Sequence, residues 1–165
     1  MKGLEQLRED VADYLRKAGI DAVAAWEHTD RVRRKTPVVS VSLRGVQGGP
    51  AGLADYLGDR LDPETGRWEE LYGKQARLTL GLDLYAPESG GEAGCAAAFA
   101  RLSEALACGR PAGLAVEELK CGETEFVREQ GLLRCPVQMV CRVFVYARLT
   151  EDGEFTDFEV KTSVS

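Results

Sequence analysis

The chain has 165 residues, of which 44% are hydrophobic and 29% are charged, and its formal net charge is −6. This length suits a single domain with its own hydrophobic core, and the mixed composition excludes intrinsic disorder and a membrane span. The acidic balance disfavours nucleic-acid binding, because the densest basic run, residues 31–35, is short and lies between two predicted strands. We expect a soluble globular protein with no nucleic-acid sequence recognition and no membrane partner.

The start of the chain, MKGLEQLREDVADYL, mixes acids and bases and lacks the basic-then-apolar order of a secretory signal, so we expect a cytoplasmic protein. His28 is the single histidine, and no nucleophile motif such as G-x-S-x-G accompanies it. The cysteines are odd in number, form no C-x-x-C pair and match no zinc spacing. We expect buried reduced thiols, no metal, no cofactor and no catalytic residue. The cysteines are Cys95, Cys108, Cys121, Cys135 and Cys141.

Hydrophobic periodicity predicts two helices. Apolar residues recur at helical spacing over residues 4–18, where Gly19 follows as a stop signal. A second apolar stripe runs over residues 95–106 and ends near Gly109. Its alanine-rich body suits close packing on a sheet.

Strict alternation predicts half-buried strands in PVVSVSLRGV (37–46) and ARLTLGLDLY (76–85). Residues 21–27 form a short strand or extended segment, and from residue 113 onward we expect three or four antiparallel strands. This order predicts an α+β fold, a single domain over residues 1–165 whose mainly antiparallel sheet has both helices packed on one face. In the second strand Leu78, Leu80, Leu82 and Leu84 share one face, and Arg77, Thr79, Gly81 and Asp83 share the other.

The stretch LDPETGRWEELYG raises the choice between an acid/base loop and a hairpin. Residues 62–66 have turn chemistry, with Asp62 first, Pro63 second and Gly66 as the left-handed residue. A turn tip keeps carboxylates solvated, which disfavours general acid/base catalysis. We therefore predict a projecting β-hairpin over about residues 53–73.

The aromatic residues of this hairpin are unusual, because an isolated two-stranded ribbon has little core to bury them. Tyr56, Trp68 and Tyr72 either anchor a neighbouring molecule or pack back on the parent domain. The sequence leaves both interpretations open. The strand at 137–146 is apolar on both faces, and the face with Phe144 and Tyr146 belongs either to a central strand or to a subunit interface.

With its elements placed, the chain resembles the phage tail terminators, also called tail-completion or head-to-tail joining proteins, of phages and prophage-derived particles. The resemblance covers most of the chain. It depends on the element order, on YLGDRLDPETGRWEELYGKQARLTLGLDLYAP, on the second helix, and on GETEFVREQGLLRCPVQMVCRVFVYA with the terminal FTDFEV.

This resemblance implies a structural protein and not an enzyme. It implies a ring, usually hexameric, that caps the tail tube, stops its polymerisation and joins it to the head connector. Its partners are then other copies of itself, the tail tube protein and the head connector protein, in the cytoplasm during assembly and later in the virion tail or tail-like particle. A ring of this kind needs a heterologous contact that closes on itself. The hairpin arm with Tyr56, Trp68, Leu71 and Tyr72 is the predicted contact, and Arg44, Arg77 and Asp83 form the predicted tube- or lumen-facing surface.

The alternative is a stand-alone α+β domain that binds a small ligand or acts as an enzyme, with a pocket between the helices and the sheet. It predicts a monomer or dimer with convergent polar groups in a concave site. The assembly interpretation predicts oligomers that depend on the hairpin.

Overall fold

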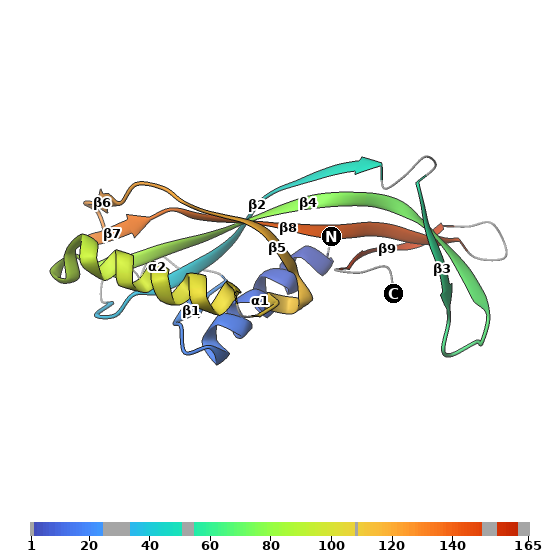
Figure 1. Cartoon of the computed structure of the whole chain (residues 1–165), viewed down its shortest axis with the longest axis horizontal. Coiled ribbons are helices and arrows are strands. Elements are labelled where there is room, and N and C mark those ends of the chain that lie inside the picture. The colour runs from blue at the N-terminus through green and yellow to red at the C-terminus, as the bar shows by residue number, and fades with distance from the viewer. Residues whose placement is uncertain (1, 25–33, 51–54, 108, 150–154, 162–165) are drawn as a thin grey trace. The chain divides into compact units, whose positions relative to one another are not determined.

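A computed structural model describes residues 2–24, 34–50, 55–107, 109–149 and 155–161. These residues form an α+β fold with two α-helices and a mostly antiparallel sheet, which confirms the predicted class (Figure 1). The helices are α1 (Lys2–Lys17) and α2 (Gly91–Ala107). The strands are β1 (Ala22–Val23), β2 (Val38–Pro50), β3 (Tyr56–Leu61), β4 (Trp68–Pro87), β5 (Ala115–Cys121), β6 (Glu125–Val127), β7 (Leu132–Cys135), β8 (Val137–Leu149) and β9 (Phe155–Lys161).

The chain divides into two compact units. The helical unit comprises Met1–Gly45 and Thr79–Cys141, and the hairpin unit comprises Val46–Leu78 and Arg142–Ser165. Three strands, β2, β4 and β8, contribute residues to both units. The expectation of one domain over residues 1–165 stays a prediction.

Among the described strands, hydrogen bonding follows the order β1-β2-β4-β7-β6. Strand β4 also pairs with β3 and with β8, and β8 in turn pairs with β5 and with β9. The pair β1–β2 is parallel, whereas β4 pairs antiparallel with β7 and with β3. The four leucines of β4 from Leu78 to Leu84 are each no more than 1% exposed, as the alternating pattern predicts.

Helix α1 ends as its sequence predicts. The Gly19 N–H donates to the Arg16 carbonyl, and the Ile20 N–H donates to the Leu15 carbonyl. These two bonds form a Schellman cap, which places Gly19 at a φ of +76° that side chains rarely adopt. Tyr14 then joins α1 to α2 by donating its hydroxyl to the Ala105 carbonyl at 2.7 Å.

Both helices lie on the same face of the strands in the helical unit (Figure 1). This is the face that carries Leu84 of β4, because Leu84 and Val39 of β2 share a cavity with residues of α2. The core of the helical unit is therefore a layer of helix residues against a layer of strand residues. Its fully buried members include Val11, Leu15, Leu80, Leu82, Leu102, Val137 and Met139.

The C-terminal half differs from the prediction in one respect. We predicted three or four strands after residue 113, and the described residues contain five. The segment LLRCPVQMVCRVFVYARL, in which we predicted the strand at 137–146, forms two strands, β7 and β8, separated by Pro136. Proline has no N–H to donate to the ladder, so the pairing is interrupted there. In the described part of the chain no helix has the length and apolar character needed to cross a membrane.

Candidate functional site

The hairpin between β3 and β4 has the predicted turn. Asp62 is its centre, because the Asp62 carboxylate accepts bonds from the Glu64 N–H at 3.0 Å and the Thr65 hydroxyl at 2.7 Å. The Gly66 N–H donates to the Asp62 carbonyl, and Gly66 has a φ of +68°. The left-handed residue therefore closes the loop as turn chemistry requires.

An exposed apolar pair lies next to this turn. Leu61 of β3 and Trp68 of β4 are directly opposite each other in the antiparallel register. Their exposed fractions are 49% for Leu61 and 71% for Trp68. The long indole therefore lies in solvent in the single chain, beside a second apolar side chain that is half in solvent. An exposed patch of this kind is typical of a contact surface.

The two hairpin tyrosines contact each other. Tyr56 and Tyr72 are cross-strand partners whose ring centroids are 5.7 Å apart at an interplanar angle of 62°. The Tyr72 hydroxyl donates to Glu70 at 2.7 Å, and this bond raises the pKa of Tyr72. A hydrogen bond to Asp59 likewise raises the pKa of Tyr56, which is 45% exposed. Each phenol therefore already donates its hydroxyl hydrogen to a carboxylate of the hairpin.

The structure corrects one predicted contact residue, Leu71, and does not describe the side chain of another, Tyr146. Leu71 is fully buried, so its side chain packs within the protein and is not available to a neighbour. The alternation of β4 explains this, since Leu71 and Trp68 point to opposite faces of the strand. Phe144 is half-buried, and the side chain of Tyr146 lies outside the described residues, as does His28.

The structure also differs from the predicted tube- or lumen-facing surface, because one of its three residues is buried. Asp83 is only 7% exposed, so it does not present its carboxylate to a tube or lumen as predicted. It is held between two arginines instead. Arg44 Nη2 lies 2.6 and 2.7 Å from the two carboxylate oxygens, and Arg134 Nη2 and Nε lie 2.8 and 3.1 Å from Oδ2.

Strand geometry produces this cluster. Arg134 of β7 pairs with Tyr85 of β4, which places it diagonally opposite Asp83 on the same face. Arg44 reaches Asp83 across Gly81, where a Cβ atom would lie only 2.3 Å from the Arg44 Nε. The hydrogen bond to Asp83 raises the pKa of Arg134 although partial burial opposes this. The cluster therefore presents guanidinium groups at the surface, with Asp83 beneath them.

Arg77 belongs to the other unit. It is an exposed residue of the hairpin unit, whereas Arg44 and Asp83 belong to the helical unit. Arg134 is the member of the cluster that sequence analysis missed. The available signal was its position as a single charged residue in the mostly apolar run LLRCPVQMV.

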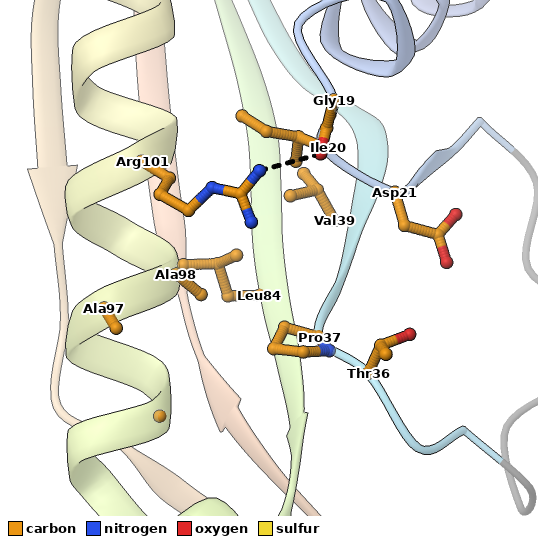
Figure 2. Close-up of a pocket in the computed structure, with 11 residues that line it drawn as sticks. Gly19, Ile20, Asp21, Thr36, Pro37, Val39, Leu84, Ala97, Ala98 and Arg101 are labelled. Atoms are coloured by element: carbon orange, nitrogen blue, oxygen red, sulfur yellow. Dashed lines mark hydrogen bonds between the residues drawn. The ribbon is translucent and has the colours of Figure 1, made fainter.

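A cavity of about 510 Å³ lies in the helical unit between α2, β4 and the start of β2 (Figure 2). Its walls are mostly apolar, with Ile20, Val39 and Leu84 opposite the alanines of α2. Arg101 extends across it and donates to the Gly19 carbonyl at 2.9 Å. The nearby Asp21 carboxylate points away from the cavity and forms an ion pair with Arg34.

No protein-family model matches the chain, and no curated protein matches it.

Proposed function

We propose that this chain is a structural protein of the tail-terminator type. It assembles as a hexameric ring on the end of a tail tube, stops tube polymerisation and joins the tube to the head connector. It acts through contacts with copies of itself, with the tube protein and with the connector protein, and catalyses no reaction. The observation that carries the proposal is the exposed pair of Leu61 and Trp68 on the hairpin.

This pair has the properties of an interface anchor. Tryptophan and tyrosine dominate the binding energy of many interfaces because they bury a large area with few rotatable bonds. Trp68 is 71% exposed in the single chain, so burying it against a neighbour removes most of its apolar surface from water. The next cross-strand pair on the same face of the hairpin, Asp59 and Glu70, is charged. An apolar centre with a polar rim is the usual anatomy of a specific contact.

The backbone of the hairpin supports the same role. Among the described strands, β3 pairs only with β4, so its second edge carries backbone donors and acceptors that a neighbouring strand can pair with. A ring requires that one edge of each subunit meet a different surface of the next. An extended hairpin with an apolar pair at its tip provides such an edge.

The function is tested by tube growth. Tail tube protein from the same particle is allowed to polymerise with and without this chain, and tube lengths are measured in negative-stain images. We expect the chain to shorten the tubes at amounts well below those of the tube protein, because one ring stops one tube end. Trp68→Ala should lose this effect. Tube lengths that are unchanged by the wild-type chain would contradict the proposal.

One observation favours a second candidate, a small-ligand-binding domain. The cavity between α2 and β4 has a volume within the range of ligand pockets, about 300–1,000 Å³. Arg101 is its principal charged group and would bind a carboxylate on a largely apolar ligand. A thermal-shift screen of short-chain carboxylic acids tests this candidate, with Ala98→Leu as a variant that fills the cavity. A shift in the wild type that Ala98→Leu abolishes would support ligand binding, and no shift would remove it.

A further inference from the structure

Two cysteine sulfurs of the helical unit lie in contact. The Sγ atoms of Cys121 and Cys135 are 2.9 Å apart, and both residues are free thiols. Cys121 ends β5 and is exposed, whereas Cys135 ends β7 and is buried. One thiol is therefore accessible to a reagent in solution and the other lies directly behind it.

The backbone holds the two cysteines in this arrangement. The Gly122 N–H donates to the Pro136 carbonyl at 2.8 Å, and these are the residues that directly follow the two cysteines. Cys135 is also fixed from the other side, because it pairs with Leu84 of β4 in the antiparallel register. The contact between the sulfurs is therefore set by strand pairing and does not depend on the position of a loose turn.

The geometry requires little movement to form a bond. A disulfide has a sulfur–sulfur length of about 2.05 Å, so the two Sγ atoms need to approach each other by less than about 1 Å. Rotation of the exposed Cys121 side chain can supply this movement without a shift of the backbone. The bond would close the loop of residues 121–135, which contains β6 and the turn that follows it.

We propose that Cys121 and Cys135 form a reversible intramolecular disulfide when the protein meets a small aliphatic disulfide such as oxidised glutathione. The Cys121 thiolate attacks one sulfur of the reagent, whose sulfur–sulfur bond breaks and releases one small thiolate. The Cys135 thiolate then attacks Cys121 Sγ in this mixed disulfide and releases the second small thiolate. Two protein thiols are oxidised, one small disulfide is reduced, and the two protons end on the two small thiols.

The surroundings of Cys135 oppose the ionisation of its thiol. Burial and the contact with Cys121 raise the pKa of Cys135 to about 12, and the nearby Cys95 thiol of α2 acts in the same direction. A hydrogen bond with Thr124 opposes these effects. Since the thiolate is the attacking species, closure should accelerate with rising pH. The pair therefore stays reduced where thiols are in excess and closes under oxidising conditions.

This proposal does not depend on the assembly function, and it is tested by thiol counting and peptide mapping. The folded wild-type protein is incubated with oxidised glutathione, quenched with N-ethylmaleimide, unfolded and digested with trypsin without reduction. We expect the loss of two of the five thiols. We also expect a linked pair of peptides, one beginning at Cys121 and one beginning at Cys135.

Matched variants identify the pair. Cys121→Ser should keep all its remaining thiols, whereas Cys135→Ser should lose one, because its mixed disulfide at Cys121 has no second cysteine to displace the small thiol. Cys95→Ser should still lose two. Cys141→Ser should also lose two, and it shows that the linked tryptic peptide is joined through Cys135, because Cys141 lies in the same peptide. Retention of all five thiols by the folded wild type would overturn the proposal, as would a link that joins any other pair of cysteines. Circular dichroism of each variant shows whether it is folded, and Cys121→Ser changes an exposed side chain that is expected to tolerate the substitution.

Discussion

Asp83 is a buried carboxylate whose charge is balanced by two arginines. Asparagine keeps one acceptor oxygen but carries no charge, so the substitution leaves Arg44 and Arg134 close together without the anion that they share. We expect Asp83→Asn to lower the free energy of unfolding by about 2 kcal/mol, because breaking a largely buried ion pair costs more than the pair contributes. The measurement is urea unfolding followed by circular dichroism.

Asp55 provides the matched control. It forms an ion pair with Lys74 at 2.5 Å, but both side chains are about half exposed. Solvent screens such a pair, so Asp55→Asn should cost less than about 1 kcal/mol. Equal losses in the two variants would show that Asp83 contributes no more than a surface charge.

The buried Cys141 thiol makes the free energy of unfolding depend on pH in the alkaline range. Burial raises its pKa from 9.0 to about 12 in the folded chain. Between these values the unfolded chain loses the thiol proton and the folded chain keeps it, so the folded state loses stability as the pH rises from about 9 toward 12. The expected slope is up to about 1.4 kcal/mol per pH unit for this group. Below pH 9 the contribution is constant.

This dependence is isolated by comparing the wild type with Cys141→Val, which has a similar volume and no titrating group. Unfolding free energies are measured from pH 8 to 11 for both proteins. The difference between them should shift in favour of the valine variant as the pH rises. Parallel curves would contradict the assigned role of Cys141.

At the scale of elements, β4 performs two separate tasks on its two faces. Leu71 is fully buried and Trp68 is 71% exposed, although they are three residues apart on one strand. We expect Leu71→Ala to lower the free energy of unfolding by about 2–5 kcal/mol, since it leaves a cavity in a packed region. Trp68→Ala should change it by less than about 0.5 kcal/mol in the monomer.

Chemical denaturation at low protein concentration measures both effects without a contribution from self-association. Comparing the two variants distinguishes a residue that stabilises the folded monomer, Leu71, from a residue that is exposed for contact with a neighbour, Trp68. A large loss for Trp68→Ala under these conditions would mean that the indole stabilises the isolated chain. The indole would then belong to the packing of the monomer and would not be free to contact a neighbouring subunit.

For the whole molecule, the sequence predicts the fold class because the relevant signals are local. The alternation of Leu78 through Leu84 defines a strand, the Gly19 stop defines a helix end, and Asp62 to Gly66 define a turn. Each signal depends on neighbours within a few residues, so it survives without knowledge of the tertiary structure.

The features that the sequence did not predict depend on distant partners. Arg134 meets Asp83 because β7 pairs with β4, and Cys121 meets Cys135 because the ends of β5 and β7 converge. Alternation alone did not show whether Leu71 lies on the buried or the exposed face of β4, because the hairpin register that buries it is a property of the assembled sheet.

The central claim is that the hairpin pair of Leu61 and Trp68 forms the contact between subunits. Light scattering coupled to size exclusion tests it most directly, with the wild type, Trp68→Ala and Phe126→Ala run over one concentration series. Phe126 is 46% exposed on β6 of the helical unit and controls for the loss of an exposed aromatic side chain.

We predict that the wild type and Phe126→Ala form particles of about six subunits as concentration rises, as expected for a closed ring, while Trp68→Ala remains a monomer. The same mass for all three proteins at every concentration would contradict the account.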